Sequence, residues 1–276
     1  MSISSFLSHA FADAPIATSS GLCPVLVFAP GMGTTPLEYS TILEDVASHG
    51  YVVVGVVSPE FARVSIFADG RIVPGSVPTG KASSRSAAAA AIDAIEASPS
   101  IVSNDLRFSL TQLASDSRFK GHVDTTRVGV VGHSIGGAAA EQFAHDDARV
   151  RAVFDIDGTS AWSRHNGPLR KPVLVLSAAS STGFNYDRML DGATPGIHLR
   201  IAGTTHSFSS DMGLMPFARD DIPNGAEATP TARGLRITAT FIEAFFNQYL
   251  NARREVLLSG PSKDYPEITF ERGSSR

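Results

Sequence analysis

The sequence predicts an α/β fold built on a mostly parallel sheet whose two faces are both covered by helices. Short, β-branched apolar runs alternate with helical segments along the chain. Several of these runs are apolar at every position, as expected for strands that are buried on both faces. The 276 residues can bury one large core, so we expect a single domain over residues 1–276.

A sheet of about six strands is expected, because six runs are short, apolar and rich in valine and isoleucine. In chain order they are Pro24–Ala29, Tyr51–Val57, Arg127–Val131, Val150–Ile156, Pro172–Ser177 and Ile197–Ile201. We find no internal repeat that would indicate a different architecture.

Two helices carry clear sequence signals. Thr35-Pro36-Leu37-Glu38 is a capping box with proline at the first helical position, and Gly50 ends that helix. Apolar residues recur at helical spacing from Leu235 to Tyr249, which predicts a long helix docked on the sheet.

Two stretches, residues 58–100 and 207–230, do not follow the alternation of strands and helices. The first is rich in Gly, Pro and Ser and becomes an Ala-rich helix near Ser86–Ala97, while the second mixes Met, Phe, Gly and Pro. Insertions of this length are often lids or binding loops, and surface excursions without a role are the alternative.

Composition and charge exclude several classes of partner. The formal net charge is −4, the pI is near 6.0, and no Lys/Arg cluster is present, so no nucleic-acid partner is expected. The longest apolar stretches are too short to span a bilayer, so no integral membrane contact is expected either. Residues 1–14 have neither a positively charged start nor a continuous apolar run. We therefore expect no signal peptide and a cytoplasmic protein.

The single cysteine, Cys23, excludes an internal disulfide and a thiolate metal site. No cluster of His, Cys or carboxylates has metal-ligand spacing such as His-Glu-x-x-His, so we expect neither a metal nor a cofactor. The sequence carries no signal of the oligomeric state.

Gly132-His133-Ser134-Ile135-Gly136 lies between an apolar strand and a helical segment. A sharp strand-to-helix turn of this kind lifts a serine hydroxyl above the sheet, and the two flanking glycines avoid collisions across the turn. The following helix directs its free N–H groups and positive dipole end at an oxyanion beside the serine. These are the features of the nucleophile elbow of α/β-hydrolases. We therefore predict that fold with Ser134 as nucleophile, the alternative being a degenerate relative that retains only the fold.

The first strand ends in Ala29-Pro30-Gly31-Met32-Gly33, where this fold supplies its second oxyanion donor. Glycines on both sides of Met32 permit a tight turn that directs its N–H inward. We expect the backbone N–H groups of Met32 and Ile135 to form the oxyanion hole, with a plain strand-to-helix turn as the alternative.

A serine nucleophile needs an imidazole base and a carboxylate that orients it, in the chain order Ser, Asp or Glu, His. Of the histidines after Ser134, His145 lies on the elbow helix, His165 in a polar loop and His198 inside a strand. His206 follows the last strand, where its side chain can return over the elbow. We therefore predict His206 as the general base.

Two candidate acids, Asp155 and Asp157, lie at the end of one strand. The usual alternative position is the loop after the next strand, but residues 178–183 hold no carboxylate. Both aspartates point to the same side of their strand, and Asp157 is nearer its end, which Gly158 marks. We predict that Asp157 orients His206 and that Asp155 is a structural carboxylate bonded to loop N–H groups.

These segments resemble the platelet-activating-factor acetylhydrolase-like branch of α/β-hydrolases. The resemblance covers residues 24–208 and rests on PVLVFAPGMG, EYSTILEDVASHGYVVVGV, GHSIGGAAAEQ, FDIDG and GTTHSF. Dienelactone hydrolases and cutinase-like polyester hydrolases are similar but place their acid after the later strand. The resemblance implies calcium-independent hydrolysis of short or oxidised acyl esters. It also implies a triad of Ser134, Asp157 and His206 with Met32 and Ile135 as oxyanion donors.

The chain departs from that family pattern at two places. Pro30 replaces the histidine of the family's His-Gly-x-Gly oxyanion loop. Only 23 residues precede Pro24, so we expect the opening hairpin to be shortened or absent, or the chain to be truncated. The identity of the substrate does not transfer across such differences.

We predict a serine hydrolase that cleaves a small, mostly apolar carboxylic ester through an acyl-serine intermediate, its partner being the small-molecule ester. Phe208, Met212 and Met215 follow His206 and are candidates for the substrate pocket, with Trp162 as a further wall; core packing explains each equally well. A biosynthetic acyltransferase or a lactonising or cyclising enzyme would use the same triad. A non-catalytic binding protein of this fold is the remaining alternative.

Overall fold

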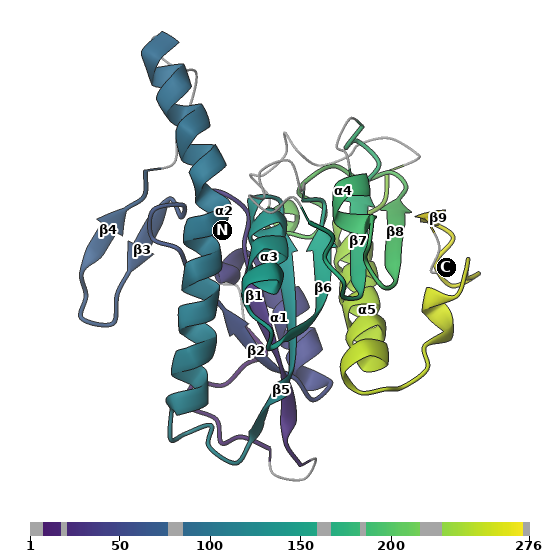
Figure 1. Cartoon of the computed structure of the whole chain (residues 1–276), viewed down its shortest axis with the longest axis horizontal. Helices are drawn as coiled ribbons and strands as arrows, with labels where there is room; N and C mark the ends of the chain where they lie inside the picture. Colours follow the sequence, from purple (N-terminus) through teal and green to yellow (C-terminus); the bar gives the residue numbers. More distant parts are fainter. Residues whose placement is uncertain are drawn as a thin grey trace.

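The computed structural model describes residues 8–17, 21–76, 85–158, 167–182, 186–215 and 228–272. Its centre is a seven-stranded sheet with helices on both faces (Figure 1). In sheet order the strands are β2 (Val52–Gly55), β1 (Cys23–Ala29), β5 (Val123–His133), β6 (Val150–Ile156), β7 (Val173–Ala178), β8 (Gly196–Ile201) and β9 (Ile268–Arg272). The first six of these pair in parallel, and β9 pairs antiparallel with β8 at one edge.

All six runs predicted as strands lie in this sheet, which confirms the predicted fold class. Strand β9, in which Ile268 is buried and the neighbouring Thr269 is exposed, was not predicted from the sequence. A strand this short that buries one face at the edge of a sheet has little periodicity to separate it from a loop. Within residues 8–17 and 21–22, no strand precedes β1.

The main helices form one layer on each face of the sheet (Figure 1). Helices α1 (Ser40–Ser48) and α5 (Thr231–Leu250) share one face with Leu26 and Phe28 of β1. Helices α2 (Arg85–Ser115) and α3 (Ile135–Asp146) cover the other face, where the alternate residues Val25 and Val27 point. The shorter helices are η2 (Pro36–Tyr39), α4 (Asp187–Leu190), η4 (Asp211–Leu214) and η5 (Val256–Leu258).

Helices η2 and α1 follow each other without a break, and the structure confirms the signals predicted for the two ends of this segment. The capping box lies at the start of η2, and Gly50 follows the end of α1. Thr35 Oγ1 accepts from the Leu37 N–H at 3.4 Å, and the Thr35 N–H donates to Glu38 Oε2 at 2.8 Å. Gly50 follows the helix with φ +93°, a left-handed conformation that glycine adopts without steric cost. The periodic segment from Leu235 to Tyr249 lies within α5.

The Ala-rich segment near Ser86–Ala97 is the first half of α2, which continues past Pro99. Proline lacks the N–H that would bond to the carbonyl four residues earlier, here that of Ile95. The buried Ser98 hydroxyl donates to this carbonyl instead, at 2.7 Å. The helix therefore ends later than the predicted Ser86–Ala97 segment, because its second half buries Val102, Leu106 and Leu110 in the core.

Residues 58–100 also contain an antiparallel hairpin of β3 (Val64–Ile66) and β4 (Ile72–Pro74). This hairpin is a separate two-stranded sheet outside the main one (Figure 1). Of residues 207–230, the structure describes 207–215, which include η4, and 228–230. The single-domain organisation and the two insertions stay predictions. Among the described helices, none is long and apolar enough to cross a membrane.

Candidate active site

Ser134 stands at the sharp turn between β5 and α3. Its backbone has φ +57° and ψ −122°, a strained conformation for a residue with a Cβ atom. A Cβ atom on Gly132 would lie 2.0 Å from the carbonyl oxygen of Gly136, and one on Gly136 would lie 2.3 Å from that of Ala29. The turn therefore requires glycine at both positions, as the predicted spacing implies. Ser134 itself is partly exposed.

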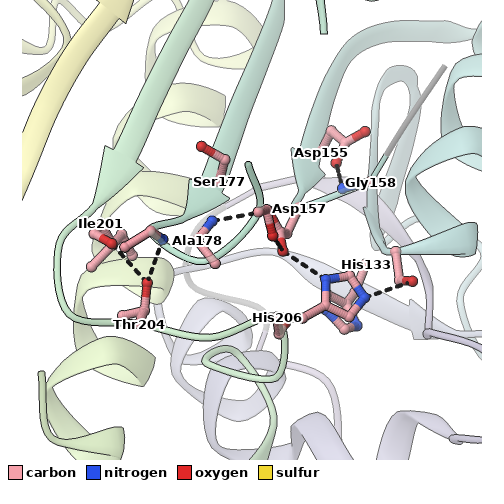
Figure 2. A network of polar contacts seen from close by, with 12 residues as sticks. His133, Asp155, Asp157, Gly158, Ser177, Ala178, Ile201, Thr204 and His206 are labelled. Carbon is pink, nitrogen blue, oxygen red and sulfur yellow. Dashed lines mark hydrogen bonds and ion pairs between the residues drawn. The ribbon is translucent and has the colours of Figure 1, made fainter. Parts of the chain in front are cut away.

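Three of the predicted site residues meet beside this turn, and Figure 2 shows two of them, Asp157 and His206. His206 Nε2 lies 2.9 Å from Ser134 Oγ, and His206 Nδ1 lies 2.6 Å from Asp157 Oδ2. A carboxylate can only accept, so Nδ1 carries the imidazole proton and the neutral Nε2 accepts from the serine hydroxyl. The side chain of His206 is 41% exposed and that of Asp157 is 0% exposed. A hydrogen-bonded chain thus leads from a buried carboxylate to an accessible imidazole and hydroxyl.

Asp157 follows β6 with φ +50°, and its carboxylate accepts hydrogen bonds on both oxygens. Oδ1 accepts from the Ala178 N–H at 2.9 Å and from the Tyr186 hydroxyl at 3.0 Å. Oδ2 accepts from the Ser181 hydroxyl at 2.6 Å, in addition to His206. Burial acts to raise the pKa of Asp157, but the hydrogen bonds from His206, Ser181 and Ala178 outweigh it and the pKa is lowered. These donors hold Asp157 in its charged form.

Asp155 has the opposite environment, although it lies only two residues earlier on β6. It is fully buried, and its Oδ1 accepts from the Gly158 N–H at 2.6 Å (Figure 2). In the described part of the chain, Oδ2 has no hydrogen-bond partner. Burial raises the pKa of Asp155 well above its usual range. Burial therefore favours the neutral form of this carboxyl group, which fastens the loop that begins at Asp157 through its bond to the Gly158 N–H.

The two predicted oxyanion donors lie on segments that pack against each other. Ile135 is the first residue of α3, where backbone N–H groups have no partner within the helix. A Cβ atom on Gly136 would lie 2.3 Å from the carbonyl oxygen of Ala29 and 2.7 Å from that of Pro30, so the loop after β1 touches the helix start. Met32 lies in that loop and is partly exposed. The roles of Met32 and Ile135 as donors stay predictions.

The predicted pocket residues differ in their surroundings. Phe208 is buried in the core cluster that includes α5. Met212 on η4 and Met215 just after it are partly exposed. Trp162 lies outside the described residues. A pocket role for any of them stays a prediction.

Of the other histidines that follow Ser134, the two that the structure describes have different polar neighbours from His206. His198 is buried on β8, with Nε2 2.9 Å from the Ser177 hydroxyl. His145 Nε2 lies 4.0 Å from Glu141 Oε1 within α3. His165 is outside the described residues.

Ser181 and Tyr186 contact Asp157 but were not predicted from the sequence. Residues 178–183 hold no carboxylate and so offer no candidate acid, although their hydroxyl groups are a usable signal. Tyr186 has no comparable signal, since nothing in its local sequence relates it to Asp157. Among the described residues, no group of three or more His, Cys, Asp or Glu side chains is arranged to hold a metal ion.

The part of the chain that holds these residues is similar to known proteins. A sequence model of the dienelactone hydrolase family matches residues 13–212, a range that includes Ser134, Asp157 and His206. A probable 1-alkyl-2-acetylglycerophosphocholine esterase from Arthroderma benhamiae is 27% identical over 278 residues. That match covers 90% of this chain, which spans only 66% of the relative's length. A solved ferulic acid esterase from Streptomyces cinnamoneus is 29% identical with a TM-score of 0.75, over 91% of this chain and 74% of that one.

Proposed function

Because the chain belongs to the dienelactone hydrolase family, we propose that it is a serine esterase that cleaves a small, mostly apolar carboxylic ester. Ser134 is the nucleophile, His206 is the general base, and Asp157 orients His206. The observation that carries this proposal is the unbroken hydrogen-bonded chain from Asp157 through His206 to Ser134, at 2.6 and 2.9 Å. The strained backbone at Ser134 supports the same assignment.

Acylation forms a covalent ester on Ser134. The serine oxygen attacks the carbonyl carbon of the substrate while His206 Nε2 takes the hydroxyl proton. The electron pair of the C=O double bond moves onto the oxygen, and the N–H groups of Met32 and Ile135 stabilise this oxyanion. The bond to the alkoxy group then breaks, and the imidazolium delivers its proton to the departing alcohol.

Deacylation repeats these steps with water in place of the alcohol. A water molecule loses a proton to His206 Nε2 while its oxygen attacks the acyl carbon. The bond to Ser134 breaks, the serine oxygen recovers the proton from His206, and the carboxylic acid departs. Asp157 accepts from Nδ1–H throughout and stabilises the imidazolium that forms twice in each cycle.

The names of both relatives describe esterases, which supports an ester carbonyl as the target. The apolar side chains of Phe208, Met212 and Met215 follow His206 closely in the sequence, which supports a mostly apolar acyl group. Water is the proposed acyl acceptor. Product analysis in the presence of an added alcohol separates hydrolysis from acyl transfer, because a transferase would form the new ester.

Covalent labelling by a fluorophosphonate tests the proposal. The folded protein is expected to form an adduct on Ser134, identified by mass spectrometry of its peptides, and to hydrolyse p-nitrophenyl esters of short acyl chains. Heat-denatured protein is the control, and it should take no label because His206 no longer activates the serine. Hydrolysis of the esters without a label on Ser134, or a label on another residue, would contradict the assignment.

Tyr186→Phe is expected to lower kcat by about 2–13-fold, the range for the loss of one hydrogen bond worth roughly 0.5–1.5 kcal/mol. Removing this donor destabilises the charged carboxylate, so the pKa of Asp157 rises and Asp157 takes up its proton at a higher pH. A carbon NMR titration of the Asp157 carboxyl group and kcat from pH 4 upward measure the two effects.

Tyr249→Phe is the matched control for this variant. Its hydroxyl accepts from Gln248 Nε2 at 2.8 Å near the end of α5, away from Asp157. This variant should leave both kcat and the Asp157 titration unchanged. If Tyr186→Phe also leaves the titration unchanged, its hydroxyl does not hold the carboxylate in the charged form.

A further inference from the structure

His133 is the residue between Gly132 and Ser134 in the Gly-x-Ser-x-Gly motif, and its side chain is buried between three segments. Its Nε2 lies 2.9 Å from the backbone carbonyl oxygen of His206, and its Nδ1 lies 2.7 Å from the Tyr39 hydroxyl. Tyr39 is the last residue of η2 and is also buried. The ring of His133 thus connects the elbow to the turn that carries His206 and to the chain that follows β1.

The chemistry of these groups determines the direction of each hydrogen bond. A backbone carbonyl can only accept, so His133 Nε2 carries a proton and donates to His206. Burial, followed by repulsion from His206, lowers the pKa of His133 to about 4. The ring is therefore neutral near pH 7, its Nδ1 has no proton, and the Tyr39 hydroxyl donates to it. The tyrosine oxygen in turn accepts from the Gly31 N–H at 3.3 Å.

The loop after β1 is shaped to fit this pair of side chains. A Cβ atom on Gly31 would lie 2.8 Å from His133 Nδ1 and 3.3 Å from the Tyr39 hydroxyl oxygen. Any side chain at position 31 would displace one of them. Gly31 directly precedes Met32, so the contact lies next to a proposed oxyanion donor.

Two further hydrogen bonds join the same segments. The Ser210 hydroxyl donates to the carbonyl oxygen of Glu38 at 3.2 Å, and Asp211 Oδ2 accepts from the Thr41 N–H at 3.0 Å. The chain after His206 is thus fastened to η2 and α1 on both sides of Tyr39.

We propose that His133 and Tyr39 are positioning residues, which hold the His206 turn and the Met32 loop in place around Ser134. This inference rests on the proposed esterase function. His133 acts through the backbone of His206 and Tyr39 through the backbone of Gly31, so neither touches the substrate. The ring centroids of His133 and His206 are 4.8 Å apart, and a neutral His133 adds no repulsion when His206 becomes positively charged during the reaction.

Three variants test the pair through kcat and KM on a p-nitrophenyl ester. Tyr39→Phe removes one hydrogen bond and should lower kcat by about 3–10-fold. His133→Phe removes two and should lower kcat by about 10–100-fold. KM should change by less than about twofold, because the reacting geometry is altered and not the binding of the substrate. His133→Gln should recover most of the activity, since its amide supplies one donor and one acceptor.

Tyr51→Phe is the matched control. Tyr51 is a buried tyrosine directly before β2, and its hydroxyl donates to Asn247 Oδ1 on α5 at 2.9 Å. This variant should lower the melting temperature about as much as Tyr39→Phe does and leave kcat unchanged. Equal effects of the two variants on kcat would show that the Tyr39 hydroxyl contributes only to stability.

Nitrogen NMR of the His133 ring gives a readout that does not depend on turnover. At pH 7 we expect a protonated Nε2 and a bare Nδ1; the opposite tautomer or a charged ring would overturn the inference. Hydrolysis by the wild type together with unchanged kcat in Tyr39→Phe and His133→Phe would overturn the positioning role alone. Absence of Ser134-dependent hydrolysis in the wild type would reject the proposed function, and the positioning role with it.

Discussion

Ser134→Ala is expected to lower kcat on any ester by about 10³-fold or more, because the acyl-enzyme can no longer form. The serine is partly exposed at the surface of the turn, and alanine has a smaller side chain with the same backbone requirements. We therefore expect the melting temperature to change little. Steady-state kinetics on a p-nitrophenyl ester and thermal unfolding measure the two quantities.

Ser103→Ala is the control for this substitution. Ser103 is buried on α2, and its Oγ has no hydrogen-bond partner among the residues that the structure describes. Its loss should leave kcat at the wild-type value. Turnover by Ser134→Ala close to that of Ser103→Ala would disprove the serine mechanism.

Asp157→Asn is expected to lower kcat by about 10³–10⁴-fold while the protein remains folded. The amide oxygen can still accept from Ala178 and Tyr186, which places the NH₂ group towards His206. An NH₂ group cannot accept from Nδ1–H, so the imidazole adopts the tautomer with its proton on Nε2. His206 then has no lone pair directed at Ser134 and cannot take its proton.

Asp155→Asn makes the same chemical change two residues away. It should leave kcat within about twofold of the wild type, because Asp155 Oδ1 bonds to the Gly158 N–H and not to the imidazole of His206. The amide oxygen can still accept from the Gly158 N–H, as Asp155 Oδ1 does. If the two asparagine variants exchange their phenotypes, Asp155 is the acid and the assignment of Asp157 is wrong.

Stability should depend on pH in opposite ways at the two aspartates. The raised pKa of Asp155 means that the folded protein keeps a proton which the unfolded chain releases above the usual aspartate pKa of about 3.9. Its contribution to stability therefore falls as the pH rises above that value. The lowered pKa of Asp157 gives a contribution that is present above about pH 3.9 and is lost as the pH falls through the folded-state pKa. Melting temperatures of the two asparagine variants between pH 3 and 8 separate these effects.

Features of the candidate active site that depend on neighbouring residues could be predicted from the sequence. The glycines around Ser134 are required by contacts across a single turn, with Gly132 and Gly136 only four residues apart. The order Ser134, Asp157, His206 follows from the succession of buried apolar strands, each of which ends at the same edge of a parallel sheet. Burial on both faces makes such strands apolar at every position, so their sequence is distinctive.

Two features that depend on packing were not fully predicted from the sequence: helix α2 is longer than predicted, and strand β9 was not predicted. The helix α2 continues past Pro99 because its second half is buried against the sheet and the Ser98 hydroxyl replaces the missing donor. The strand β9 forms because β8 presents an unpaired edge. Local propensity carries no information on the burial of α2 or on the strand that pairs with β9, and tertiary contacts override it.

The sequence alone was sufficient to assign the fold class and to propose Ser134, His206 and Asp157 as a triad, since turn sterics and strand burial act over short distances along the chain. Only the tertiary structure shows what surrounds them. Tyr39 lies 94 residues from His133, and Tyr186 lies 29 residues from Asp157. A tyrosine hydroxyl becomes a donor to a buried acceptor only when the folded sheet brings the two together and excludes water, and no local pattern encodes that meeting.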